Sequence, residues 1–166
     1  HFDHGNAYYC GYLTLVDKLL GTCLSLKGKV VAVTGASGAM GQALIKQLSR
    51  QGARVVALTS SQTTDFPPGV EVLSWQLGAE AALAERLQKV DILILNHGIN
   101  VYGDRSPAAI HKSYEINTFS TLRLAELFLA TVTESDHKAI KELWINTSEA
   151  EVNPALSPLY ELSKRT

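Results

Sequence analysis

The sequence predicts an α/β fold in which helices cover both faces of one parallel sheet. Short runs rich in β-branched residues alternate with helical patterns from Lys29 onward, which is typical of successive βαβ units. These runs are almost continuously apolar, as expected for strands that helices cover on both sides. A glycine-rich segment at residues 34–41 joins the first run to the first helical pattern. We therefore expect a doubly wound parallel sheet with the strand order 3-2-1-4-5.

Each element has its own local signal. The predicted strands are residues 30–34, 54–58, 70–74, 91–95 and 143–147. Met40, Leu44, Ile45 and Leu48 repeat at helical spacing, and Gly52 is placed to end that helix in a left-handed conformation. Residues 79–88 predict a crossover helix and residues 114–132 a long amphipathic helix, whereas residues 59–69, rich in Ser, Thr and Pro, predict a loop.

Length and composition favour one compact domain that takes a small-molecule ligand. A chain of 166 residues with 46% hydrophobic residues can bury one sizeable core, and its net charge of -1 argues against a nucleic-acid partner. Cys10 and Cys23 lack metal-type spacing, and no apolar run reaches the roughly 18 residues that span a bilayer. We expect a soluble domain on the cytoplasmic side. Because the chain begins with histidine and ends inside a predicted helix, we also expect it to be a fragment.

The glycine-rich segment predicts a binding loop for a dinucleotide. Gly35, Gly38 and Gly41 stand at a spacing of three between a strand and a helix. Glycine at these positions allows a tight turn and a close approach of backbone N–H groups to a pyrophosphate, and the helix N-terminus favours negative charge. The same segment contributes Ser37, Ala39 and Met40 to the predicted site. The alternative is a glycine-rich turn that binds no ligand.

From this loop onward, residues 27–166 resemble the short-chain dehydrogenase/reductase family. The resemblance implies a Rossmann fold, truncated at its C-terminus, over residues 25–166. The compact branch of the family has a TGxxxGxG pattern, in which Ala39 stands here at the middle glycine. The TGxxGxxG pattern of the extended branch fits Gly35, Gly38 and Gly41 better, so the branch stays open.

The ends of the second, third and fourth strands carry the remaining predicted cofactor residues. Thr59, Ser60 and Ser61 follow the second strand without the acidic residue that selects NAD, which favours NADP(H) over NAD(H). By the family resemblance, Gln76 and Leu77 would face the adenine. The segment formed by Asn96, His97 and Gly98 resembles the family's NNAG motif, with a histidine at the second asparagine. A lone histidine in such a loop is expected to be structural.

Four residues form the predicted catalytic set. Tyr160 and Lys164 are four apart, so they share a helical face, where the ammonium would lower the pKa of the phenol. Taken alone, they could equally be two exposed helix residues. The family resemblance adds Ser148, which would hold the substrate oxygen, and Asn117, which would anchor a water beside Lys164. Tyr160 would exchange a proton with the substrate, and Lys164 would bind the nicotinamide ribose. No metal ligand is predicted.

Residues 1–22 do not fit this pattern and resemble the end of a sterol desaturase/fatty acid hydroxylase domain. The residues that carry this resemblance are Asn6, Tyr12, Leu15, Asp17, Leu20, Gly21 and Thr22. We interpret residues 1–24 as the tail of a preceding membrane hydroxylase, through which the parent protein would associate with a membrane. The two histidines of this tail are too few to build a di-iron site.

The predicted function is an NAD(P)H-dependent oxidoreductase that acts on a carbonyl or alcohol, with a lipid as the substrate class that the fusion suggests. The alternative is a non-catalytic NADP(H)-binding module that regulates the attached hydroxylase. Ala39, Gln76 and Glu149 depart from the family pattern and suit this alternative. A third reading is a fragment that only binds cofactor. A homo-oligomer stays open for the intact protein.

Overall fold

The computed structural model describes residues 26–61, 65–134, 140–148 and 157–165. Within these ranges the chain forms one five-stranded sheet of order β3-β2-β1-β4-β5, in which all neighbouring strands are parallel. The strands are β1 (Val30–Thr34), β2 (Arg54–Thr59), β3 (Glu71–Ser74), β4 (Ile92–Leu95) and β5 (Glu142–Ile145). The predicted fold class and strand order are confirmed, with strand ends shifted by one or two residues. The predicted hydroxylase tail, residues 1–24, lies outside the described residues.

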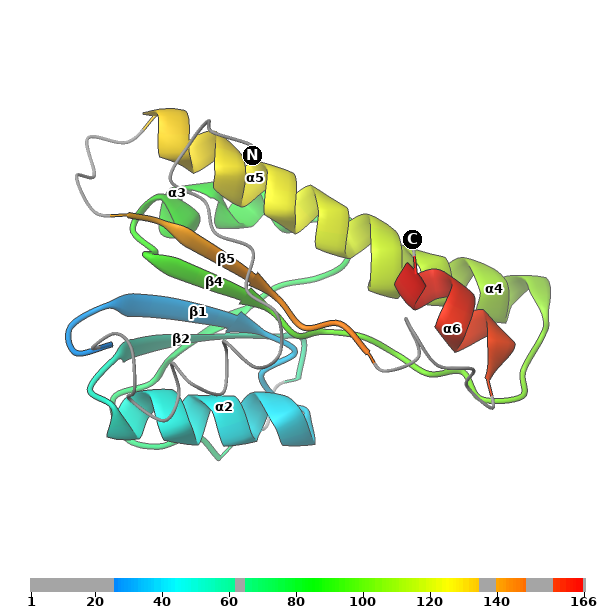
Figure 1. The fold of residues 1–166 in the computed structure, drawn as a ribbon, viewed down its shortest axis with the longest axis horizontal. Coiled ribbons are helices and arrows are strands. Elements are labelled where there is room, and N and C mark those ends of the chain that lie inside the picture. Colours follow the sequence, from blue (N-terminus) through cyan, green and yellow to red (C-terminus); the bar gives the residue numbers. More distant parts are fainter. Residues whose placement is uncertain (1–25, 62–64, 135–139, 149–156, 166) are drawn as a thin grey trace, which may run out of the picture.

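Helices cover both faces of the sheet. α2 (Ala39–Arg50) lies on one face, whereas α3 (Ala84–Gln88) and α5 (Ser120–Glu134) lie on the other (Figure 1). Two short helices, α4 (Pro107–Tyr114) and α6 (Pro158–Arg165), pack together beyond the carboxyl ends of the strands. None of the helices in the described ranges is both long and apolar enough to cross a membrane.

Two predicted helices differ from the observed ones. The segment predicted as one helix at 79–88 is a 3-10 turn, η1 (Glu80–Leu83), followed by the short α3. The helix predicted from residue 114 starts earlier, at Pro107, because Ser106 caps it by accepting a hydrogen bond from the amide of Ala109 (3.2 Å). It also contains a π turn, η2 (Glu115–Phe119), between α4 and α5. A pattern of apolar spacing cannot register either the cap or one extra residue in a turn.

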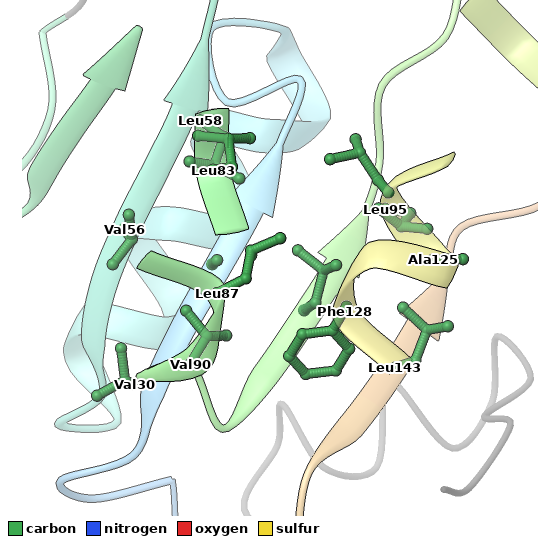
Figure 2. Packing of buried hydrophobic residues seen from close by; sticks show 13 residues of the cluster. Val30, Val56, Leu58, Leu83, Leu87, Val90, Leu95, Ala125, Phe128 and Leu143 are labelled. Carbon is green, nitrogen blue, oxygen red and sulfur yellow. The ribbon is translucent and has the colours of Figure 1, made fainter. Parts of the chain in front are cut away.

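The core consists of two apolar layers, one on each face of the sheet. Figure 2 shows the layer between the sheet and the α3 and α5 side, where Leu87 and Phe128 pack over the strands. On the other face, Ile45 and Leu48 of α2 pack against β1, and Trp144 joins the same layer. Every residue of β1 is therefore buried, which explains its continuous apolar run.

The third strand departs from the prediction of full burial. β3 forms an edge of the sheet, and Glu71, Val72 and Ser74 are exposed. An edge strand has one neighbour, and the short α3 leaves part of its surface uncovered. Glu71 instead forms an ion pair with Arg86 of α3.

Candidate active site

In the glycine-rich loop between β1 and α2, backbone atoms pack directly against Gly35 and Gly41. A Cβ on Gly41 would lie 2.2 Å from the carbonyl oxygen of Gly35. Gly35 itself has φ +62° and would place a Cβ 2.8 Å from the Cα of His97. Neither position tolerates a side chain. Gly38, by contrast, has an extended backbone, and its Cβ would meet only the Gly35 oxygen at 3.4 Å, so the space beyond it is open within the described residues.

The N-terminus of α2 faces this loop and suits an anion. Gly38 is the N-cap and, as a glycine, makes no side-chain cap hydrogen bond to the first turn. The first turn carries no acidic residue. Unpaired helix amides and the positive end of the helix dipole favour a phosphate at such a terminus.

A cavity of about 410 Å³ lies at the carboxyl ends of β1, β2, β3 and β4. It brings together most of the residues predicted to bind the cofactor, and we call it the cofactor cavity. Its lining residues are Gly35, Ser37, Gly38, Ala39, Met40, Gly41, Ser60, Trp75, Leu77, Asn96, His97, Gly98, Ile99 and Ile116.

Three predicted cofactor residues of the second and third strand ends do not line this cavity. Thr59 is the last residue of β2, and its buried hydroxyl accepts a hydrogen bond from the amide of Ser61 (3.0 Å). The hydroxyl of Ser61 donates to that of Ser37 (3.2 Å), which places Ser61 against the glycine-rich loop. Gln76 lines a separate cavity of about 520 Å³ between β3 and α3.

Sequence reasoning did not include Trp75, Ile99 and Ile116 among the cofactor residues. Trp75 directly follows β3, as Ser60 follows β2, and parallel strands end at one edge of a sheet. That equivalence was a usable signal for Trp75. Ile116 comes from the π turn, which no local pattern indicated.

His97 is a neutral, buried part of the cavity wall. Its Nδ1 lies 2.8 Å from Oγ1 of Thr34, and its ring meets Trp75 edge-on at 5.4 Å between centroids. Burial lowers the pKa of His97 to about 4, and the positive charge of Lys164 acts in the same direction. An uncharged imidazole held by Thr34 agrees with the structural role expected for it.

Asn117 ties three segments together from the π turn. Its Oδ1 accepts a hydrogen bond from the amide of Ile99 (2.8 Å). Its Nδ2 donates to the carbonyl oxygen of Ile99 (2.9 Å) and to the hydroxyl of Ser163 (2.9 Å). The loop after β4 and helix α6 are thereby fixed to the π turn. The side chain is buried, so each of these bonds is shielded from water.

The side-chain ends of Lys164 and Asn117 both lie close to Gly98. A Cβ on Gly98 would lie 3.0 Å from Nζ of Lys164 and 3.2 Å from Oδ1 of Asn117. A side chain at Gly98 would therefore press on the lysine ammonium and on the Asn117 amide, which would have to shift by a few tenths of an ångström. Burial lowers the pKa of Lys164 from its ordinary value. Lys164, Asn117 and His97 also line a third cavity, of about 390 Å³, on the α5 and α6 side of the sheet.

The other two predicted catalytic residues, Tyr160 and Ser148, lie on α6 and on the segment after β5. Tyr160 is half-buried in the first turn of α6, one helical turn before Lys164. Ser148 is half-buried and lies three residues beyond β5. The intervening residues 149–156, including Glu149, lie outside the described residues.

Comparison with known proteins identifies similar sequences and folds. The model of the NAD dependent epimerase/dehydratase family matches residues 31–153. Monoglucosyldiacylglycerol epimerase of Synechocystis sp. (strain ATCC 27184 / PCC 6803 / Kazusa) is 57% identical over 171 residues, which cover 99% of this chain and 42% of the relative. The chain thus spans less than half the length of this curated relative.

Solved structures with the same fold include short-chain dehydrogenases. The enzyme of Burkholderia cenocepacia J2315, in complex with NADP, has a TM-score of 0.73 and 24% identity, covering 86% of this chain and 63% of that one. The enzyme of Leptospira borgpetersenii serovar Hardjo-bovis (strain JB197), with bound NAD+, has a TM-score of 0.73 and 23% identity, covering 84% and 61%.

Proposed function

Since the chain belongs to the NAD-dependent epimerase/dehydratase family, of the short-chain dehydrogenase/reductase type, we propose that its site epimerises the sugar of a glycolipid. In this reaction one hydroxyl-bearing carbon is oxidised and then reduced from the opposite face. The observation that carries the proposal is the convergence of Lys164 and Asn117 at Gly98, on the wall of the cofactor cavity. The 57% identity to monoglucosyldiacylglycerol epimerase supports the substrate class.

The residues present fit a nicotinamide dinucleotide. The loop of Gly35, Gly38 and Gly41 and the uncapped start of α2 would hold the pyrophosphate. Ser37 and Ser60 line the cavity, with Ser61 bonded to Ser37, and would accommodate a 2′-phosphate, so we propose NADP(H) as the preferred cofactor. When bound, the nicotinamide supplies the acceptor and donor of hydride.

The catalytic residues would move the proton and fix the reacting oxygen. Tyr160 would take the proton of the substrate hydroxyl while the carbon that bears this hydroxyl gives up a hydride. Tyr160 would return the proton when the resulting carbonyl is reduced. Ser148 holds the substrate oxygen. Lys164, fixed at Gly98 beside Asn117, binds the nicotinamide ribose. The reduction in the second step returns the hydride that the oxidation removed in the first step, so the substrate and the product have the same oxidation state.

The test is stereochemical conversion by the full-length protein. Purified protein is incubated with monoglucosyldiacylglycerol and a catalytic amount of NADP+, and the sugar is identified by proton NMR. We expect an epimeric sugar without net formation of NADPH. Tyr160→Phe should abolish conversion and keep NADPH binding, whereas Tyr102→Phe, on an exposed loop, should leave both unchanged.

The possible failures are distinct. Stoichiometric NADPH formation with a ketone product would make the protein a dehydrogenase. NADPH binding without any conversion would support the regulatory module instead.

A further inference from the structure

An ion cluster built around the buried Glu80 lies between the segment after β3 and the helix that carries Asn117. We define the Glu80 cluster as Glu80, Ser120, Arg123 and Glu115. The carboxylate of Glu80 accepts hydrogen bonds from Nε (3.1 Å) and one terminal nitrogen (2.9 Å) of Arg123, and from the hydroxyl of Ser120 (3.0 Å). The same terminal nitrogen of Arg123 donates to Glu115. Arg123 therefore holds two acids from two segments.

The cluster is charged although Glu80 is buried. The side chain of Glu80 is 4% exposed, and that of Arg123 is 38% exposed. Burial alone would raise the pKa of Glu80, but the hydrogen bonds from Arg123, from the amide of Gly78 and from Ser120 outweigh it and lower the pKa to about 2. An ion pair of this kind is weak evidence for net stability compared with apolar packing, and a role in fixing positions is the alternative that the geometry allows.

One end of the cluster reaches the adenine side of the cofactor cavity. Glu80 accepts a hydrogen bond from the amide of Gly78 (3.1 Å), a residue with φ +81°. Leu77, directly before Gly78, lines the cofactor cavity. The cluster therefore fixes the course of the chain from Leu77 to Glu80.

The other end supports the π turn. Glu115 is the first residue of η2, and Ser120 directly follows its last residue. Asn117 lies in the middle of that turn, and Ile116 of the same turn lines the cofactor cavity. π turns are rare, occur mostly as single turns inside α-helices, and are frequent at functional sites. Arg123 and Ser120 tie this turn to Glu80 from one side, while Asn117 reaches Ile99 and Ser163.

We propose that Arg123 is a positioning residue that couples the adenine-side segment to the π turn, and through Asn117 to Lys164. The proposal rests on the proposed function, since it concerns the same cofactor. It predicts that substitutions in the cluster can weaken binding of the nicotinamide end of the cofactor without weakening binding of its adenine end. Breaking the contact with Glu115 should disturb the nicotinamide end, because Asn117 and Lys164 lie there. Breaking both contacts should disturb both ends.

The experiment compares NADPH with its adenine half, 2′,5′-ADP, by calorimetric titration of the full-length protein. Glu115→Gln should weaken NADPH about tenfold, within the range of coupling seen for residues of one hydrogen-bond network. The same variant should bind 2′,5′-ADP as the unmodified protein does. Arg123→Gln should weaken both ligands, and Arg123→Lys should recover part of the loss.

Two controls separate positioning from general stability. Arg86→Gln breaks the Arg86–Glu71 pair, which joins α3 to β3 without contacting the π turn. It should leave both affinities unchanged. In an Asn117→Ala background, Glu115→Gln should no longer change NADPH affinity, since the residue through which the coupling acts is gone.

The proposal is overturned if Glu115→Gln weakens both ligands equally or neither, or if its effect persists without Asn117. Thermal unfolding must show each variant folded at the titration temperature. Where Arg123→Gln fails that criterion, Arg123→Lys and Glu115→Gln carry the test. Because these titrations need no substrate, failure to epimerise a glycolipid leaves their result intact.

Discussion

Replacing Gly41 with alanine should disrupt the closed form of the glycine-rich loop. The new Cβ would lie 2.2 Å from the carbonyl oxygen of Gly35, 2.8 Å from the Cα of Ala36 and 2.9 Å from the Ala36 oxygen. Favourable contacts between non-bonded heavy atoms begin near 3.5 Å. All three neighbours are backbone atoms, so no flexible side chain can move away. The loop and the first turn of α2 must shift together.

The size of the effect follows from this geometry. Overpacking a well-packed site costs about 1–3 kcal/mol, and rigid neighbours place Gly41→Ala near the upper end, about 3 kcal/mol. For a domain of about 150–250 residues, each kcal/mol lowers Tm by about 2–4 °C. We therefore expect Tm to fall by about 6–12 °C, and NADPH binding to weaken because the displaced loop no longer presents its amides.

Gly38→Ala is the matched control, since it adds the same methyl group three residues earlier. Its Cβ would lie 3.4 Å from the nearest atom, and its φ of -71° suits any residue. Tm should therefore change little, whereas NADPH should bind more weakly because the methyl group occupies the approach to the pyrophosphate. Circular dichroism melting and NADPH fluorescence titration measure both properties. An unchanged Tm in Gly41→Ala, or an equal fall in Gly38→Ala, would refute the reasoning.

Three further predictions concern selectivity, pH and burial. Ser60→Asp should weaken NADPH about tenfold relative to NADH, because a carboxylate would face the 2′-phosphate; an unchanged ratio in fluorescence titrations would contradict this. The lowered pKa of His97 means that its neutral form stabilises the fold fully above pH 6.5, and that about 3 kcal/mol is lost as the pH falls toward 4. In His97→Asn, urea unfolding should lose that part of the pH dependence. Lys141→Met should cost about 2 kcal/mol in the same assay, because the buried Lys141 ammonium donates to the Leu87 carbonyl (3.1 Å) and the Thr131 hydroxyl (2.9 Å).

The parts of the fold that depend on local composition could be predicted. Apolar runs identified the five strands. The glycine-rich segment after the first strand indicated the doubly wound dinucleotide-binding fold, whose strand order the sheet has. Gly52 ends α2 with φ +79°, as its position indicated. The exposure of β3 could not be predicted in this way, because it depends on the length of α3 and on the edge position, which are properties of the assembled sheet.

The candidate site shows the same division. Asn117 could be singled out by its motif, but its partner Ser163 lies 46 residues away and carries no signal of its own. The π turn that presents Asn117 depends on Glu80, which is 43 residues from Arg123. Interactions at such separations are decided by packing, so periodicity within either helix cannot indicate them. The exclusion of Gln76 from the cofactor cavity likewise depends on the path of the chain after β3.

The arrangement around Gly98 bears on the choice between an enzyme and a regulatory module. A module that only senses a dinucleotide needs the glycine-rich loop and the strand ends, which supply the pyrophosphate and adenine contacts. It has no need of a partly buried ammonium near the nicotinamide end. Here burial lowers the pKa of Lys164, so keeping it charged in that place is unfavourable. The Nζ of Lys164 nevertheless packs closely against Gly98, and buried Asn117 lies at the same point. Such a placement would be of direct use in the proposed catalysis, where Lys164 would assist a proton exchange at Tyr160, and this is the physical reason to expect turnover.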